Sequence, residues 1–207
     1  MFAIVESGSI TSFPKGNRGI QIGSVKHSAD IFTSKWTESE RNAIGVYTIE
    51  IDNTNLKDDA WYVNTNITYA YDSSAKKVKG TYGTATAKPH ADTTYTNTDK
   101  SNGDIPTGKN VGDVKEEGLK TVLIRQVKRK AQEILNETDW YITRNAEKST
   151  AIPSAITTHR DAVRTKQASM ETAITNAADA PALETLYTYT TTDGVTSRPL
   201  GELPTLE

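Results

Sequence analysis

The sequence predicts an α+β fold, with a β-rich N-terminal domain followed by a helical hairpin C-terminal domain. Short alternating runs rich in β-branched and aromatic residues come first, and a segment dense in Gly, Pro, Asn, Asp and Thr follows them. Apolar residues then recur at helical spacing. We therefore expect a β-rich domain over residues 1–87, a linker or extended arm over 88–112, and a helical domain with a short C-terminal tail over 113–207.

The β-rich part opens with two runs that predict a hairpin. FAIV at residues 2–5 and ITSF at 10–13 are joined by the turn-forming ESGS, and Pro14 and Gly16 end the second run. GIQIGSV at 19–25 predicts a further strand. We expect these runs to belong to a small antiparallel sheet.

One short helix is expected inside this sheet domain. Thr37 and Glu40 have the spacing of a capping box, in which each side chain accepts a hydrogen bond from the backbone of the other residue. Gly45 is placed to end the helix. VYTIEI, which starts at Val46, then alternates as a strand does.

The last β-rich stretch predicts a meander with one apolar face. WYVNTNITYAY at 61–71 is expected to be one strand, DSSAKK at 72–77 a turn, and VKGTYGTATA at 78–87 the returning strand. Large apolar residues are few here, so we expect the second face of the sheet to be open to water or covered by a partner.

The second half predicts helices that pack through one apolar stripe. A first helix of about six turns is expected from Asp113, because apolar residues follow one another at spacings of three and four. A break at Asn136 precedes a short helix over 140–148, and Pro153 occupies the first turn of a long third helix. The stripe of the first helix contains Leu119, Val122, Leu123, Val127, Ala131, Ile134 and Leu135. A short helix in PALETLY and a Thr-Asp-Gly turn complete the chain.

Composition excludes several classes of function. The chain has 207 residues with 24 basic and 26 acidic side chains and a net charge of −2, so no global field attracts nucleic acid or an anionic membrane. It has no cysteine, which excludes disulfides and thiolate catalysis. No apolar run approaches the roughly 20 residues that a membrane span requires, and the opening MFAIVESGS does not resemble an export signal.

No motif in the sequence predicts a catalytic residue, a cofactor site or a metal site. GDIPTGKN at 103–110 fits part of a phosphate-binding loop, but Asn110 replaces the required Ser or Thr, and neither a strand before it nor a helix after it is expected. His27, His90 and His159 are too far apart for a local metal motif, and we expect them to be exposed or at an interface. The basic run RQVKRK at 125–130 spreads around a helix and is flanked by glutamates, which favours a solvated face.

Residues 137–164 predict the corner of a helical hairpin. Thr138 can cap a helix, Trp140 can be a buried anchor, and Arg144, four residues later, can lie over the indole or pair with Glu147. Beyond Pro153, two arginines four residues apart share a helix face, and an aspartate is spaced to pair with the second. The residues expected to define the fold or an interface are Trp140, Arg144, Pro153, Arg160 and Arg164.

The same residues resemble a known family. ILNETDWYITRNAEKSTAIPSAITTHRDAVR is similar to the C-terminal region of tail fibre assembly proteins and related small tail proteins of tailed bacteriophages. The resemblance covers about fifty residues, roughly 120–171. The matching positions are Leu135, Thr138, Asp139, Trp140, Arg144, Pro153, Arg160, Ala162, Val163 and Arg164.

This resemblance implies a non-enzymatic bacteriophage tail protein, a structural adaptor or fibre-attached component of the virion tail or baseplate. Its partners would be other phage tail or fibre proteins, we expect a homo-oligomer, and it would be made in the cytoplasm of the infected bacterial host. One alternative is a tail fibre assembly chaperone that is not retained in the particle. Another is a carbohydrate-binding module or hydrolase acting at the host surface, which would need exposed aromatics such as Trp61, Tyr69 and Tyr82 on one sheet face, or a close pair of carboxylates.

Overall fold

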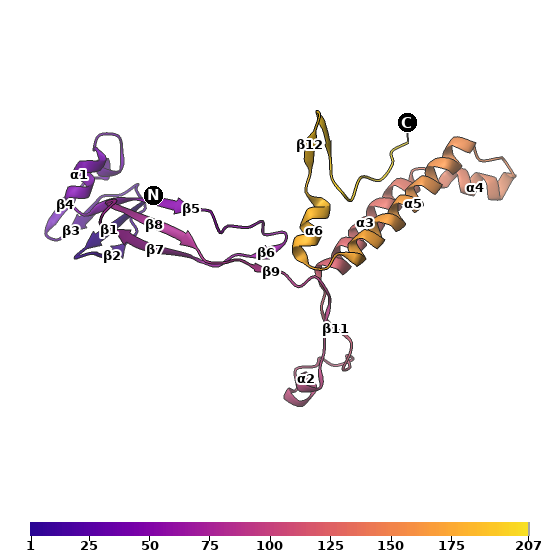
Figure 1. The fold of residues 1–207 in the computed structure, drawn as a ribbon, viewed down its shortest axis with the longest axis horizontal. Helices are drawn as coiled ribbons and strands as arrows, with labels where there is room; N and C mark the ends of the chain where they lie inside the picture. The colour runs from indigo at the N-terminus through magenta and orange to yellow at the C-terminus, as the bar shows by residue number, and fades with distance from the viewer. Residues whose placement is uncertain (207) are drawn as a thin grey trace. The chain divides into compact units, whose positions relative to one another are not determined.

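The computed structural model describes residues 1–206 and has an α+β composition, with strands dominating the N-terminal part and helices the C-terminal part (Figure 1). The chain divides into two compact units, Met1–Thr86 and the residues from Ala87 on. Residues 88–112 belong to the second unit. Glu207, the last residue of the predicted helical domain, lies outside the described residues.

The first unit is built on a five-stranded sheet with the order β2-β1-β5-β8-β7. As predicted, β1 and β2 form a hairpin, and its turn residues Ser7 and Gly8 both have positive φ angles, 50° and 80°. The strands of this sheet are β1 (Phe2–Glu6), β2 (Ser9–Ser12), β5 (Val46–Asp52), β7 (Ile67–Asp72) and β8 (Lys77–Tyr82). Further elements of this unit are β3 (Ile20–Ile22), β4 (Val25–His27), the 3-10 helix η1 (Ala29–Phe32), α1 (Glu38–Ala43) and β6 (Tyr62–Val63).

The sheet is not the antiparallel meander that was predicted, because β5 and β8 are parallel. The stretch expected to be a single strand over 61–71 is broken into β6 and β7, and residues 53–66 form a long connection after β5. This connection lets the β7–β8 hairpin place its second strand, rather than its first, beside β5. The turn expected at 72–77 is present between β7 and β8.

One face of the sheet is open to water at the β7–β8 hairpin, as expected: Thr68, Ala70, Lys79 and Thr81 are all exposed. Nearer β1, Ile4, Ile31 and Val46 pack with partly buried residues of β3 and η1 and of the segments that flank α1. On the opposite face Ala3, Val5, Ile49 and Val78 pack with Ile10 and with tyrosines of β5 and β7, all of them residues of the sheet itself. The capping box of α1 is present as predicted: the Thr37 hydroxyl accepts from the Glu40 amide, and the Glu40 carboxylate accepts from the Thr37 amide.

The second unit begins with an ordered arm. Its elements are β9 (Thr86–Ala87, at the unit boundary), β10 (Thr93–Thr94), α2 (Asn97–Asn102) and β11 (Val114–Glu116), with β10 and β11 paired antiparallel. α2 has a capping box made by Thr96 and Asp99, and the Lys115 ammonium lies 2.5 Å from the Asp99 carboxylate. These contacts hold Asp99 nearly buried. The helix expected from Asp113 therefore starts later, because residues 114–116 pair as a strand.

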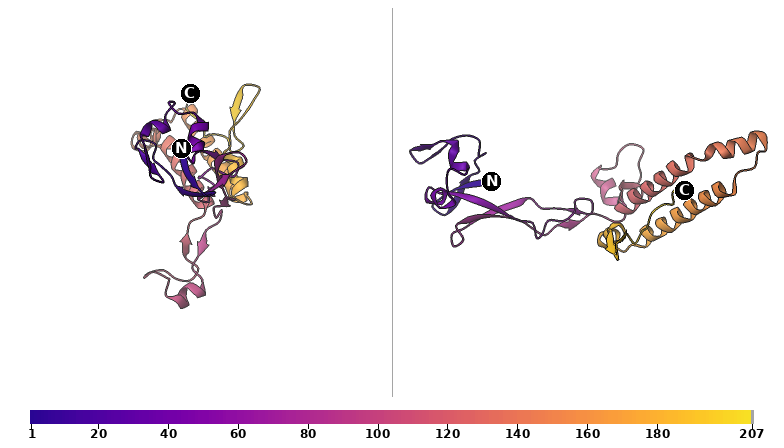
Figure 2. Two further views of the ribbon diagram at one scale, coloured as in Figure 1. Left: turned by 90° about the vertical axis from the view of Figure 1, so that its left-hand side faces the viewer. Right: turned by 90° about the horizontal axis from the view of Figure 1, so that it is seen from above.

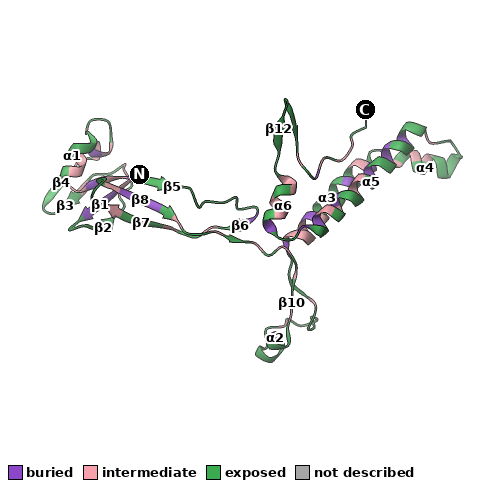
Figure 3. Cartoon of the chain, in the orientation of Figure 1, coloured by how far each residue is buried: buried purple, intermediate pink, exposed green. Residues whose placement is uncertain are grey.

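The helices of the second unit pack through the predicted stripe. They are α3 (Leu119–Asn136), α4 (Asp139–Lys148), α5 (Ser154–Asn176) and α6 (Ala180–Tyr187). α3 and α5 are antiparallel, since Lys120 donates to the Thr175 carbonyl at one end and Arg160 donates to the Leu135 carbonyl at the other. Figure 2 shows the two helices side by side, and Figure 3 shows buried residues along their shared seam.

The C-terminal part closes against these helices. Leu183 of α6 and Leu200 of the tail are both buried. Between them, β12 (Thr190–Thr192) and β13 (Val195–Ser197) form a ribbon whose six residues are all exposed. Its Asp193-Gly194 turn has positive φ angles of 53° and 78° at both positions, as a type I′ turn requires.

Candidate interaction site at the α3–α4–α5 corner

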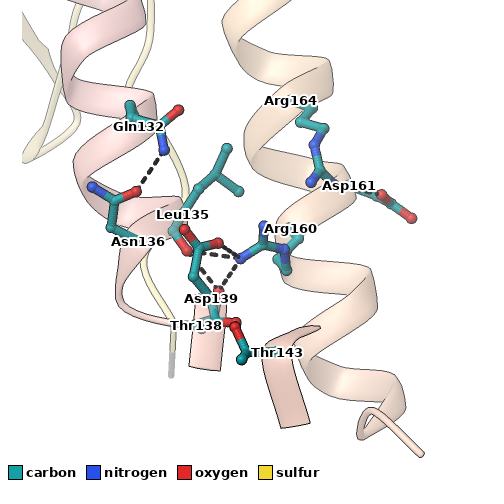
Figure 4. A network of polar contacts seen from close by, with 9 residues as sticks. All are labelled: Gln132, Leu135, Asn136, Thr138, Asp139, Thr143, Arg160, Asp161 and Arg164. Atoms are coloured by element: carbon teal, nitrogen blue, oxygen red, sulfur yellow. Dashed lines mark hydrogen bonds and ion pairs between the residues drawn. The ribbon is translucent and has the colours of Figure 1, made fainter. Parts of the chain in front are cut away.

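A buried arginine organises the corner where α3, α4 and α5 meet. Arg160 is 7% exposed, and its Nη1 lies 2.7 Å from the Leu135 carbonyl oxygen, 2.7 Å from the Thr138 hydroxyl and 2.9 Å from the Asp139 carboxylate (Figure 4). The three acceptors come from the last turn of α3, the loop and the first residue of α4. We call Arg160, Leu135, Thr138 and Asp139 the Arg160 cluster.

The arrangement follows from the end of α3. The last carbonyls of a helix have no amide donor four residues on, so buried ones must find other partners. Leu135 supplies such a carbonyl, which accepts from the Thr138 amide, the Thr138 hydroxyl and the Arg160 guanidinium. Hydrogen bonds from a charged donor are among the stronger ones. The Arg160 cluster therefore fixes the direction in which the chain leaves α3.

Thr138 does not cap α4 through its side chain, in contrast to the prediction. It precedes the helix, but its hydroxyl donates to Leu135 and accepts from Arg160, so that no side-chain capping bond is made. With 2% of its surface exposed, Thr138 is instead part of the buried corner.

Trp140 is not the buried anchor that was predicted. It is 51% exposed, and among the described residues of α4 none is buried. The reason is that the buried side chains of Leu135, Ile156 and Val163 already fill the interface between α3 and α5, so that the indole is not needed there.

The indole of Trp140 is nevertheless ordered by its neighbours on α4. Its ring centroid lies 3.8 Å from that of Tyr141, and the Arg144 guanidinium lies 4.7 Å from the Trp140 centroid and 5.4 Å from the Tyr141 centroid. This is the position that the spacing of Arg144 predicted. We call Trp140, Tyr141 and Arg144 the Trp140 stack.

The remaining predicted site residues lie around this corner. Pro153 is exposed and directly precedes α5, one position before the predicted first turn, and its carbonyl accepts the amides of Ile156 and Thr157. Arg164 is exposed and lies 3.3 Å from Asp161, the ion pair expected from the spacing. Arg160 and Arg164 therefore differ strongly in burial.

His159 is also buried, at 8% exposure, and the expectation that it is exposed or at an interface was wrong. It lies on α5 one position before Arg160.

A second arginine, Arg198, which was not predicted from the sequence, anchors the C-terminal tail. The Arg198 guanidinium lies 2.7 Å and 2.8 Å from the two Glu202 carboxylate oxygens and stands 5.1 Å and 5.2 Å from the ring centroids of Tyr187 and Tyr189. The Tyr189 hydroxyl donates to Glu202, which raises the pKa of that tyrosine, and burial raises the pKa of Tyr187. The four-residue spacing of Arg198 and Glu202 could have indicated this ion pair, but such spacing brings side chains together in a helix, and no helix was expected there.

The tail and α3 together line a groove of about 400 Å³. Its floor is apolar, with Val127, Ile134, Met170 and Leu203, and Lys130, Glu133 and Glu137 contribute charged groups to its wall. Its volume lies at the lower end of the usual range for small-molecule pockets.

Two of the three aromatic residues considered for a carbohydrate-binding platform, Trp61 and Tyr69, pack within the first unit. Trp61 is 8% exposed, and the Tyr69 ring packs against Phe13 with a centroid distance of 4.8 Å. A sugar-binding platform stacks its ligand on exposed ring faces, and these two rings are engaged within the first unit.

In residues 1–206 no group of three or more His, Cys, Asp or Glu side chains is arranged to hold a metal ion. No helix in that part of the chain has the length and apolarity needed to cross a membrane. Comparison with known proteins found no matching family model, no matching curated protein and no matching solved structure.

Proposed function

We propose that this protein is a non-enzymatic bacteriophage tail protein that acts by binding, as a structural adaptor or fibre-attached component of the virion tail or baseplate. The resemblance of residues 120–171 to small tail proteins motivates the proposal. The observation that carries it is the Trp140 stack, in which the exposed indole of Trp140 packs against the partly buried side chains of Tyr141 and Arg144 beside the buried Arg160 cluster.

The composition of the Trp140 stack supports a protein partner. Trp, Tyr and Arg are the residues most often found at the energetic centres of protein interfaces. The three side chains are held against one another before any partner binds, so little conformational entropy remains to be lost on binding. Arg160 is too buried to touch a partner and would act only by positioning α4.

In this proposal α3, α4 and α5 form a helical hairpin whose corner is the docking element. The partners are other tail or fibre proteins, and further copies of the chain in a homo-oligomer. The protein would be made in the host cytoplasm and retained in the virion tail. No nucleic-acid contact is part of the proposal, because the net charge is −2 and the basic run of α3 is interspersed with ion pairs such as Arg129–Glu133.

A transient assembly chaperone is the alternative that uses the same corner. It differs only in whether the protein stays in the particle. Mass spectrometry of purified particles separates the two: a fixed copy number relative to the major tail proteins supports the adaptor, whereas absence from particles with recovery in a fibre complex supports the chaperone. Absence from both would overturn the phage-tail proposal.

A pair of variants on one helix tests the docking element. Trp140→Ala should reduce incorporation into particles at least tenfold, while Ile142→Ala, which removes another exposed apolar side chain of α4, should leave it within twofold. Far-UV circular dichroism of both proteins checks that they remain folded. Equal incorporation of the two variants would contradict a contact through the Trp140 stack.

A further inference from the structure

Arg144 differs from the other arginines of the second unit in its electrostatic partners. Its guanidinium lies 4.7 Å and 5.4 Å from the ring centroids of Trp140 and Tyr141, and within the described residues it forms no ion pair with a carboxylate. The other arginines of this unit each pair with an Asp or a Glu; they are Arg125, Arg129, Arg160, Arg164 and Arg198. Arg144 is therefore the cation of this unit whose charge the described chain leaves uncompensated by a direct partner.

The geometry of α4 explains why Arg144 lacks such a partner. Side chains of a helix lean toward its N-terminus and meet residues three and four positions away. In that direction Arg144 meets Tyr141 and Trp140. Glu147, the acid within helical reach, lies on the C-terminal side and is exposed. Of the two positions that the spacing allowed, over the indole or beside Glu147, the structure shows the first.

The guanidinium of Arg144 still has hydrogen-bond donors to offer. Its Nε is buried, and no described residue accepts a hydrogen bond from it. The side chain as a whole is half-buried, so the two terminal nitrogens are the part of the group that a partner can reach. A charged donor that loses water without gaining an acceptor costs free energy. An acceptor supplied by another molecule would reduce this cost.

A carboxylate is the acceptor that fits this arrangement best. The planar end of a guanidinium matches the two oxygens of a carboxylate, and such bidentate pairs are strong and geometrically specific. The rings of Trp140 and Tyr141 border the guanidinium, so apolar atoms next to the carboxylate can pack on them. The group recognised is thus an Asp or Glu side chain with an apolar neighbour.

A nucleic-acid backbone fits the same surface less well. Sites for single strands combine aromatic rings with several cations that follow successive phosphates. α4 contains two basic residues, Arg144 and Lys148, and two acidic residues, Asp139 and Glu147. A helix with balanced charge does not attract a polyanion, whereas one carboxylate needs only one guanidinium.

We propose that the Trp140 stack binds an exposed Asp or Glu side chain of another tail or fibre protein through the terminal nitrogens of Arg144, with an adjacent apolar group of that protein on the indole. This contact rests on the proposed function, because it gives the chemistry of the partner at the same site. Arg144 is already held on the two rings, so the ion pair forms with little further loss of side-chain freedom.

Two variants of Arg144 test the need for its charge. Arg144→Gln leaves the carboxylate of the partner unpaired, so incorporation into particles should fall about tenfold or more. Arg144→Lys keeps a cation without the planar pair and should fall less. Glu147→Gln removes the neighbouring acid and is the matched control, which should stay within about twofold of the wild type. Far-UV circular dichroism checks that each variant is folded.

The outcomes separate this contact from the proposed function. Normal incorporation of Arg144→Gln together with loss of Trp140→Ala would overturn the carboxylate contact and leave the proposed function standing. Absence of the wild type from particles and from fibre complexes would overturn both.

A zero-length cross-link identifies the group that Arg144 contacts. A carbodiimide joins an amine to a carboxylate only where the two touch. Arg144→Lys, made in the Glu147→Gln background, should therefore be joined at position 144 to an Asp or Glu of another tail or fibre protein, in particles or in the fibre complex. Ile142→Lys in the same background places an amine on another exposed position of α4 and should not be joined. Mass spectrometry of the digested proteins locates the linked residues.

Three results of this experiment would contradict the contact. They are a cross-link at position 142 alone, a cross-link from position 144 to a second copy of this chain, and no cross-link at position 144 in a variant that enters particles.

Exchange of the two charges is the most specific test. Arg144→Glu should block incorporation, and replacement of the cross-linked acid of the partner by arginine should restore it. A purely structural role of Arg144 gives no such rescue. Retention of a single-stranded oligonucleotide by the purified wild type, with loss of retention in Arg144→Gln, would assign the Trp140 stack to nucleic acid and overturn the proposal.

Discussion

The Arg160 cluster and the Trp140 stack lie within a few residues of each other, and each depends on an arginine, but they differ in what surrounds the charge. Arg160 is 7% exposed and contacts three oxygen acceptors from three parts of the chain. Arg144 contacts two aromatic rings of its own helix. The first arrangement determines the local fold, whereas the second leaves ring faces available to a partner.

The comparison teaches that resemblance to a family does not assign a role to each matching residue. From the proposed resemblance to small tail proteins, Trp140 and Arg160 were both expected to define the fold or an interface. Burial now separates them: Arg160 is suited to hold the corner, and Trp140 is suited to contact another molecule. Four predictions sharpen this separation.

The largest effect is expected from Arg160→Met. The change removes the charged donor to the Leu135 carbonyl and to the Thr138 hydroxyl and the partner of Asp139, and hydrogen bonds from buried charged groups are strong, so the free energy of unfolding should fall by about 3 kcal/mol. Urea unfolding followed by circular dichroism measures it. A loss below about 1 kcal/mol would mean that the corner is held by the α3–α5 seam alone.

Trp140→Ala should have a smaller effect on stability than on binding. Because half of the side chain is exposed, the main loss is the contact with Arg144, worth about 1 kcal/mol. The same urea experiment checks this value. A loss of about 3 kcal/mol or more is typical of a buried aromatic side chain. It would indicate that Trp140 is part of the core and would contradict its role in the docking element.

Arg164→Met should change stability by less than about 0.5 kcal/mol, since exposed ion pairs contribute little. Arg164 lies on the same helix as Arg160, four residues later, and pairs only with Asp161 at 3.3 Å in the described contacts. It is therefore the matched control for Arg160→Met. Similar losses for the two variants would show that burial does not distinguish them.

The last prediction concerns pH and is confined to the arm. The Lys115 ammonium and then Thr96 hold the pKa of Asp99 well below its usual value of 3.8. Because the pKa is lower in the folded arm than in the unfolded chain, ionised Asp99 stabilises the arm above pH 3.8, and this contribution is lost as the pH falls toward the folded pKa.

Carbon-13 NMR of the Asp99 carboxyl should therefore show no inflection near pH 3.8, and Asp99→Asn should remove the acid dependence of the Lys115 signals. A titration midpoint at the ordinary value would mean that the Asp99–Lys115 contact does not persist in solution. The Arg160 cluster should be unaffected by Asp99→Asn, which makes it an internal reference.

The sequence was sufficient to predict features that depend on near neighbours. The Thr37–Glu40 capping box, the apolar stripe of α3, the position of Arg144 over the indole and the Arg164–Asp161 pair all follow from spacings of three or four residues. The α+β composition also followed from local periodicity.

Features that depend on distant residues were not predictable in this way. The parallel pairing of β5 with β8 depends on where a long connection leads the chain. The exposure of Trp140 depends on whether the seam between α3 and α5 has room for it, and the burial of Arg160 depends on a carbonyl 25 residues earlier. Hydrophobicity alone assigned Trp140 to the core, because it cannot report which faces are already filled.

Arg160 follows Leu135 by 25 residues and Thr138 by 22 residues in the sequence, and this sequence separation has a consequence for the order of folding. The chain from Leu135 to Asp139 is synthesised before Arg160, so α3 can form while its last turn still lacks the guanidinium. The direction of α4 is then set only when the first turns of α5 have emerged and packed. The exposed Trp140 would thus acquire its final orientation relative to α3 late, and a nascent chain interrupted before Arg160 should carry the same aromatic residues without a fixed orientation toward α3.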